Sequence, residues 1–154
     1  MGTIKNKSRI ERNSQLIENY VKSSILDADC VLTVDLFHAA PISLANSKKK
    51  IRKFFDRIRS KVGNSEYILL TNMDNQIPTH KMLVQLKEST SKFEVLLRDC
   101  WTNSVVEVAK AEDADKLASR FTDYYSDAVE NLYFSRENSK LVKSKIFQKS
   151  RIGN

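Results

Sequence analysis

Alternation of apolar and polar residues marks the first strong element of the chain, at residues 29–38. This run is rich in β-branched and apolar residues and is too short for a core helix, so it predicts a strand. One side of the strand should be buried under helices, and the other should be more open and carry a carboxylate, Asp35. The strand ends before Pro41, which cannot continue a ladder of backbone hydrogen bonds. The predicted buried set is Leu32, Val34 and Leu36, and the open set is Thr33, Asp35 and Phe37.

Apolar residues spaced three and four apart predict helices over about 9–26 and about 44–62. A Ser-x-x-Glu capping box should start the first helix, and residues 1–7 ahead of it should fray. Basic residues fill the outer surface of the second helix, which should end at Gly63.

Further short runs of apolar residues predict two strands joined by a turn. A helix, a strand and a long last helix are predicted to follow. On the third strand, Met82 and Val84 should share one side, and Lys81 and Gln85 the other. We expect a single domain over residues 1–135, followed by a basic tail (136–154) that is a short helix or an arm. The expected elements are strands at 67–72, 80–87 and 105–109, and helices at 93–101 and 112–132.

The order strand, helix, strand, strand, helix, strand is the βαββαβ pattern of the ferredoxin-like α+β (α/β) fold, here with an extra N-terminal helix and a long C-terminal helix. Right-handed crossovers then place the first and third strands side by side in the centre of the sheet. Both crossover helices should cover the face that holds Leu32 and Met82. The opposite face must meet the first helix, the last helix or a ligand.

Charge is segregated along the chain, which carries 26 Lys and Arg against 19 Asp and Glu, a formal net charge of +7. The second helix and the tail are basic, whereas residues 107–130 are acidic. This distribution is typical of a nucleic-acid binder, although a solvated surface that keeps the protein soluble is the simpler alternative. The basic residues that we predict to contact nucleic acid are Lys48, Lys49, Lys50, Arg52, Lys53, Arg57, Arg59, Lys61, Lys81, Lys140, Lys143 and Lys145.

Several common sites and locations are not indicated by the sequence. Cys30 and Cys100 lack metal-ligand spacing and are expected to be free thiols in a reducing compartment. No apolar run approaches the roughly 20 residues of a membrane span, and no signal-peptide pattern opens the chain, so we expect a cytoplasmic protein with no membrane partner. There is no glycine-rich phosphate loop and no Gly-x-Ser-x-Gly turn, which argues against a nucleotide hydrolase or an esterase.

Three stretches, 31–36, 78–83 and 120–125, resemble in order the motifs of the HUH endonuclease superfamily of rolling-circle replication initiators and relaxases. The nearest variety is the inovirus-type replication proteins, whose first strand and basic Phe-Phe helix look similar to residues 31–59. The resemblance covers residues 28–130 and implies a DNA-binding protein of a mobile element such as a phage or plasmid.

In that family, two histidines at i and i+2 of one strand hold a divalent metal, and a helix tyrosine attacks the DNA. Here the corresponding positions hold Thr79 and Lys81, neither of which binds a metal well, and His80 should project to the other face. We therefore expect no cofactor, with Mg or Mn relevant only if nicking is retained. Lys81 could instead hold a phosphate. A register shifted by one residue places His80 and Met82 there, which suits a hard cation no better. A metal site could be rebuilt from His38, His80 and Asp35.

The tyrosine motif is altered as well. Phe121 occupies the position expected for the nucleophile, which leaves Tyr124 and Tyr125 as catalytic candidates. Core and boundary packing of an amphipathic helix is the simpler account of both tyrosines. Phe37, Tyr67 and Trp101 are candidates for stacking on bases, with core packing the alternative for Trp101.

Three functions remain open from the sequence. The first is a single-stranded or hairpin DNA-binding protein like a replication initiator, with lost or weakened nicking activity. The second is an active metal-dependent nickase that uses a helix tyrosine. The third is a regulatory module that binds a protein partner through the open sheet face or the acidic last helix.

Overall fold

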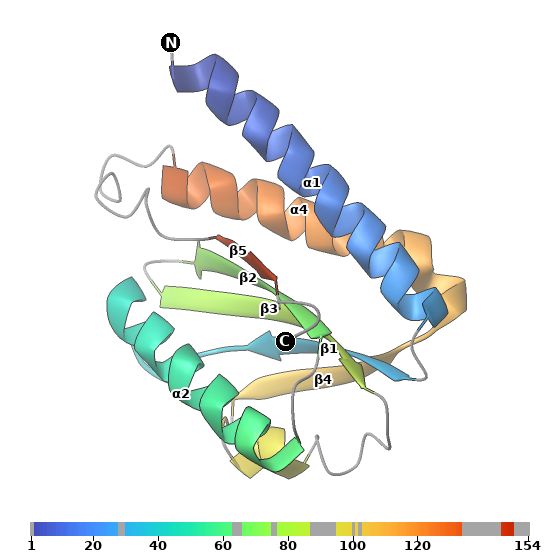
Figure 1. Ribbon diagram of the computed structural model, residues 1–154. Helices are drawn as coiled ribbons and strands as arrows, with labels where there is room; N and C mark the ends of the chain where they lie inside the picture. The colour runs from blue at the N-terminus through green and yellow to red at the C-terminus, as the bar shows by residue number, and fades with distance from the viewer. Residues whose placement is uncertain are drawn as a thin grey trace.

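The computed structural model describes residues 2–27, 30–62, 66–74, 77–86, 95–99, 101, 103–133 and 146–149. The elements are α1 (Gly2–Asp27), β1 (Cys30–Leu36), α2 (Leu44–Val62), β2 (Glu66–Asp74), β3 (Ile77–Leu86), β4 (Ser104–Ala109), the 3-10 turn η1 (Ala111–Asp113), α4 (Ala114–Tyr133) and β5 (Phe147–Lys149) (Figure 1). Residues 95–99 are also helical.

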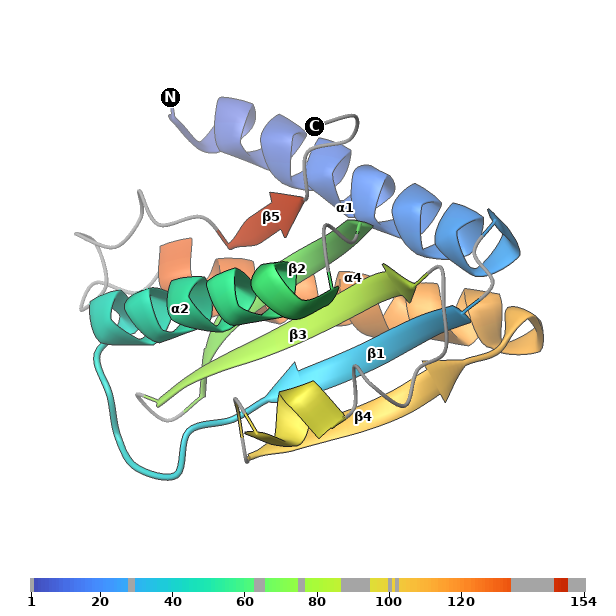
Figure 2. The same ribbon diagram turned by 60° about the horizontal axis from the view of Figure 1, so that its bottom comes forward.

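The strands form one sheet in the order β4-β1-β3-β2-β5, and every neighbouring pair is antiparallel. The order β4-β1-β3-β2 is that of the ferredoxin-like fold, so the predicted fold class is confirmed. The predicted pairing of the first and third strands is confirmed too, with Leu32 opposite Val84 and Asp35 opposite Lys81. Figure 2 shows β1 and β3 adjacent in the middle of the sheet.

One face of the sheet is covered by α2 and the helical residues 95–99, as predicted. Leu32, Val34 and Leu36 are completely buried there against apolar residues of α2. Trp101 is part of this core, and its indole Nε1 donates a hydrogen bond to the Phe37 carbonyl oxygen at 2.7 Å. Trp101 is thus a packing residue, because its ring lies inside the core and its polar edge is satisfied.

The opposite face is covered by α1 and α4, which are two of the three partners expected for it, and it is therefore less open than the pattern of the first strand suggested (Figure 1). The apolar stripe of α4, including the completely buried Phe121, packs onto Leu83 and Ile68 and meets α1 from the other side. An amphipathic helix of this length must bury its stripe, and the sheet face is the surface that it buries. Among the described residues of this face, those at the margin near β4 are more open, and Val105 is 48% exposed.

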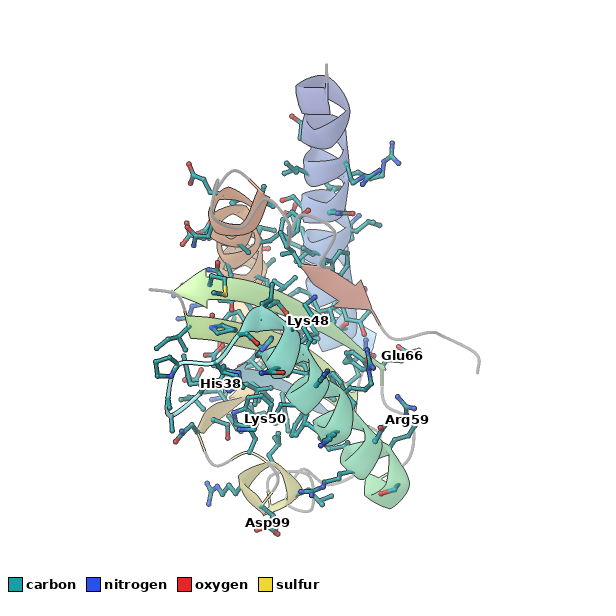
Figure 3. The ribbon with its side chains drawn as sticks, turned by 90° about the vertical axis from the view of Figure 1, so that its left-hand side faces the viewer. His38, Lys48, Lys50, Arg59, Glu66 and Asp99 are labelled. Atoms are coloured by element: carbon teal, nitrogen blue, oxygen red, sulfur yellow. The ribbon has the colours of Figure 1, made fainter. Side chains whose placement is uncertain are left out.

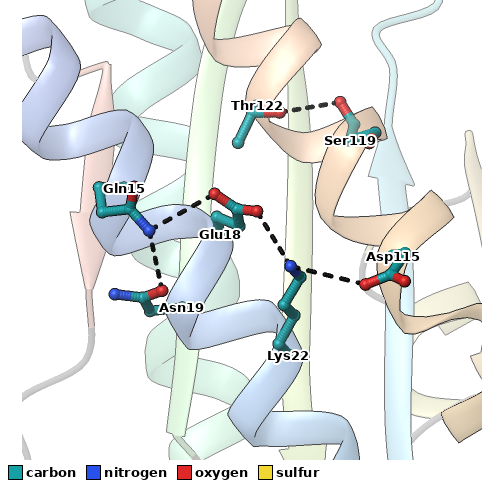
Figure 4. Close-up of polar contacts among 7 residues, drawn as sticks. All are labelled: Gln15, Glu18, Asn19, Lys22, Asp115, Ser119 and Thr122. Atoms are coloured by element: carbon teal, nitrogen blue, oxygen red, sulfur yellow. Dashed lines mark hydrogen bonds and ion pairs between the residues drawn. The ribbon is translucent and has the colours of Figure 1, made fainter.

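The two outer helices are also joined by charge. Lys22 of α1 lies 3.0 Å from Glu18 on its own helix and 3.5 Å from Asp115 of α4 (Figure 4). These side chains are well exposed, so the two ion pairs contribute little to stability.

Two further differences from the sequence expectations concern the ends of the chain. The first helix begins at Gly2, so the Ser8-x-x-Glu11 pattern lies inside the helix and does not cap it. At the other end, residues 147–149 form β5 on the edge of β2, where a helix or an arm was expected. Ile146 is buried, and its carbonyl oxygen accepts a hydrogen bond from the Thr71 amide at 2.9 Å. A strand of three residues is too short to show a sequence pattern, and it forms here because the edge of β2 offers unpaired backbone groups.

Within the described residues, no helix combines the length and the apolar character that crossing a membrane requires. The side chains of Cys30 and Lys61, together with Cys100, Lys140, Lys143 and Lys145, lie outside the described part of the structure.

Candidate nucleic-acid interface

A polar cluster lies between the sheet and α4, at the positions that the family resemblance picked out. Lys81 of β3 donates a hydrogen bond from Nζ to Asp35 Oδ1 of β1 at 2.8 Å, and these side chains are 16% and 34% exposed. Thr79 Oγ1 lies 2.6 Å from the hydroxyl oxygen of Tyr124 on α4. Lys81 Nζ also lies 5.8 Å from the centre of the Tyr124 ring. The structure therefore brings Thr79, Lys81 and a helix tyrosine together on one face.

The two candidate tyrosines differ in their surroundings. Tyr125 is 1% exposed in the core and its hydroxyl accepts a hydrogen bond from Asn13 Nδ2 at 3.0 Å. Tyr124 is half-buried beside Thr79. Tyr124 is thus the less buried of the two candidates, whereas Tyr125 joins α4 to α1 through its hydroxyl.

On the other face, His80 is buried in a chain of hydrogen bonds. Ser47 Oγ lies 2.7 Å from His80 Nε2 and 2.7 Å from His38 Nε2. Thr71 Oγ1 lies 3.0 Å from His80 Nδ1, so both ring nitrogens of His80 are satisfied. Burial, reinforced by the charges of His38 and Lys48, lowers the pKa of His80 to about 3. His80 is therefore a neutral imidazole near pH 7.

The three candidate metal ligands do not converge. His38 and His80 lie together, with ring centres 5.9 Å apart, and burial also lowers the pKa of His38. Asp35, however, alternates to the opposite face, where it pairs with Lys81. Among the residues that the structure describes, no group of three or more His, Cys, Asp or Glu side chains could hold a metal ion.

Ser47 and Thr71 are site residues that the sequence reasoning missed. Ser47 is completely buried within the inward stripe of α2, and Thr71 is buried on β2. A lone hydroxyl in an otherwise apolar helical stripe was the available signal, because a buried hydroxyl needs a partner.

The outer surface of α2 is the most basic part of the described structure. Six of its basic side chains are exposed, and Lys48 is half-buried. Asp56 is the one acidic residue of this helix and lies 4.0 Å from Arg59. Figure 3 shows Lys48, Lys50 and Arg59 spread along its length. The exposed set is Lys49, Lys50, Arg52, Lys53, Arg57 and Arg59.

The aromatic candidates for base stacking fall in different places. Trp101 is in the core, although Lys50 Nζ approaches its ring at 4.8 Å from outside. Phe37 is 41% exposed at the end of β1. Tyr67 of β2 is half-buried and stacks on Phe55 of α2, with ring centres 4.4 Å apart and an angle of 18° between the planes.

No protein-family model matches the sequence, and no curated protein matches it. Among solved structures, the chain is similar to the crystal structure of the hypothetical protein ORF119 from Sulfolobus islandicus rod-shaped virus 1. The TM-score is 0.48 at 14% sequence identity, over 73% of this chain and 91% of that chain. The function therefore has to be inferred from the side chains of this protein.

Proposed function

We propose that this protein binds nucleic acid, with single-stranded or hairpin DNA as its ligand, as a cytoplasmic protein of a mobile genetic element. The observation that carries the proposal is the outer surface of α2, which has six exposed basic side chains and only one acidic residue, Asp56. Such a surface neutralises phosphates and releases the counterions condensed on them, which supplies affinity without sequence preference.

The cluster at Tyr124 supports the comparison with a replication initiator. A helix tyrosine lies 2.6 Å from Thr79, and Lys81 shares its face, so a tyrosine lies beside the two metal-ligand positions that the resemblance implies, although Phe121 holds the expected nucleophile position. Thr and Lys are poor ligands for a divalent cation. We therefore propose that this protein binds DNA and that its nicking activity is lost or weakened. The position of Tyr124 also favours an active nickase as the second candidate function.

Incubation with labelled single-stranded and hairpin DNA, with and without Mn, separates the two candidates. We expect a retarded complex in both conditions and no covalent protein–DNA adduct, because the metal-ligand positions are substituted. A stoichiometric adduct that disappears in Tyr124→Phe and persists in Tyr125→Phe, the matched control in the core, would establish the active nickase. Absence of any complex at low salt would contradict both candidates.

We expect Lys81 to release its ion pair with Asp35 and to bind a phosphate of the DNA instead. Lys81→Met should weaken binding of single-stranded DNA by roughly tenfold, because a charge-assisted hydrogen bond contributes about 1.5–3 kcal/mol. Asp35→Asn should strengthen binding, because the competing carboxylate charge is removed. Fluorescence anisotropy measures both changes, with Lys110→Met, an exposed lysine after β4, as the control. Unchanged affinity in both Lys81→Met and Asp35→Asn would leave the pair with a purely structural role.

A further inference from the structure

A groove of about 200 Å³ lies between α2 and the strands β2 and β3, on the sheet face opposite Tyr124. One wall carries three cations of α2, Lys48, Arg52 and Arg59. Asp56 is the acidic residue of this lining and is only 4.0 Å from Arg59. The groove therefore has an excess of positive charge and suits an anion.

The cations share one flank of the helix because of their spacing. Lys48, Arg52, Phe55 and Arg59 recur at intervals of four, three and four residues, which keeps them on one side of an α-helix. Figure 3 places Lys48 toward the beginning of α2 and Arg59 toward its end. Lys53 and Arg57 belong to the same helix but do not line the groove.

The groove also has a flat apolar wall. Phe55 and Tyr67 line it as a stacked pair, with ring centres 4.4 Å apart. The phenol of Tyr67 is neutral near pH 7, and burial raises its pKa further, so it does not repel an anion. A neutral aromatic wall beside cations is the combination on which nucleic-acid bases stack while their phosphates are held.

We infer that this groove holds one nucleotide unit of a bound nucleic-acid strand. Arg52, Arg59 and Lys48 contact the phosphate, and the Phe55–Tyr67 pair contacts the base. The volume of about 200 Å³ is below the roughly 300 Å³ of sites that enclose drug-sized ligands, so the groove holds no more than one unit and leaves the rest of the strand outside. The inference rests on the proposed function and deepens it, since it converts a diffuse basic surface into one with a defined nucleotide site.

Two double variants of equal charge test the phosphate contact. Arg52→Gln with Arg59→Gln removes two groove cations, and Lys53→Gln with Arg57→Gln removes two cations elsewhere on α2. Both pairs lower the affinity for single-stranded DNA through lost charge. The groove pair should lower it about tenfold further, because it also loses directed hydrogen bonds to the phosphate.

An oligonucleotide with abasic sites tests the base contact. The wild-type protein should prefer the intact strand by about tenfold, the effect of one stacked base. Tyr67→Leu should reduce this preference, and Phe55→Leu is a second variant in case the first does not fold.

The outcomes keep the two proposals apart. Failure of the wild-type protein to bind any DNA would overturn the proposed function and the groove inference together. Equal losses in the two double variants, or an unchanged preference for the intact strand in the folded aromatic variants, would overturn the groove inference alone. Tighter binding of free thymidine monophosphate than of the strand would assign the groove to a free nucleotide and also overturn it.

Discussion

Raising the salt concentration from about 50 to about 200 mM is expected to weaken binding of single-stranded DNA roughly 300-fold. The exposed face of α2 provides six basic side chains, and each one that contacts a phosphate releases counterions. For single strands, the logarithm of the binding constant falls by about 0.7 per contact for each tenfold rise in salt. Fluorescence anisotropy at several salt concentrations gives this slope directly.

Removing charge from α2 should flatten that dependence. The triple variant Lys49→Gln, Lys53→Gln, Arg57→Gln is expected to reduce the slope by about 2, because three contacts are lost. The matched control neutralises Arg9, Arg12 and Lys116 to Gln, exposed residues of α1 and α4 on the other side of the sheet. An equal slope in the α2 variant and the wild-type protein, or binding that ignores salt, would place the interface elsewhere.

Acidification is expected to destabilise the fold through His80. Burial holds the pKa of His80 at about 3 in the folded protein, against an ordinary value of 6.5 in the unfolded chain. Between these two values the unfolded state binds more protons than the folded state. The free energy of unfolding therefore falls as the pH falls through this window, by about 1.4 kcal/mol per pH unit and on the order of 5 kcal/mol in all.

Urea unfolding at several pH values between 7 and 4 measures this effect, with His80→Gln as the variant. The variant should be less stable than the wild-type protein at pH 7, because Ser47 and Thr71 lose a well-placed partner. The difference should shrink as the pH falls, since glutamine does not titrate. Parallel stability curves for the two proteins would contradict the account of a buried neutral His80.

The central part of the fold could be predicted from the sequence because its signals are local. Alternation over residues 31–36 and helical spacing over 44–62 each match an element of the structure closely. The order of the elements together with the rule of right-handed crossovers then places β1 beside β3. The register follows from the buried side chains, since a slip of one residue would turn Asp35 and Lys81 into the apolar core.

The parts that could not be predicted depend on contacts distant in sequence. β5 has three residues and exists because β2 offers an unpaired edge. The stripe of the last helix was visible in the sequence, but it left open whether the first helix, the last helix or a ligand would meet the second face of the sheet.

The proximity of Thr79, Lys81 and the last helix could be predicted from the sequence, but the surroundings of each tyrosine could not. Thr79, Lys81 and the tyrosine helix do meet on one face, yet Tyr124 and Tyr125 are neighbours whose roles depend on the rotation of α4 about its axis. The hydrogen-bonded chain through Ser47 and His80 joins residues 33 positions apart, and no local pattern indicates it.

Photo-crosslinking of labelled single-stranded DNA to the wild-type protein, followed by mass spectrometry of the crosslinked peptides, tests the central claim most directly. Crosslinks in residues 44–62 of α2 and 66–74 of β2 are the predicted result, because the basic surface and the groove lie there. Crosslinks confined to α1 and α4, or no crosslinks at low salt, would contradict it.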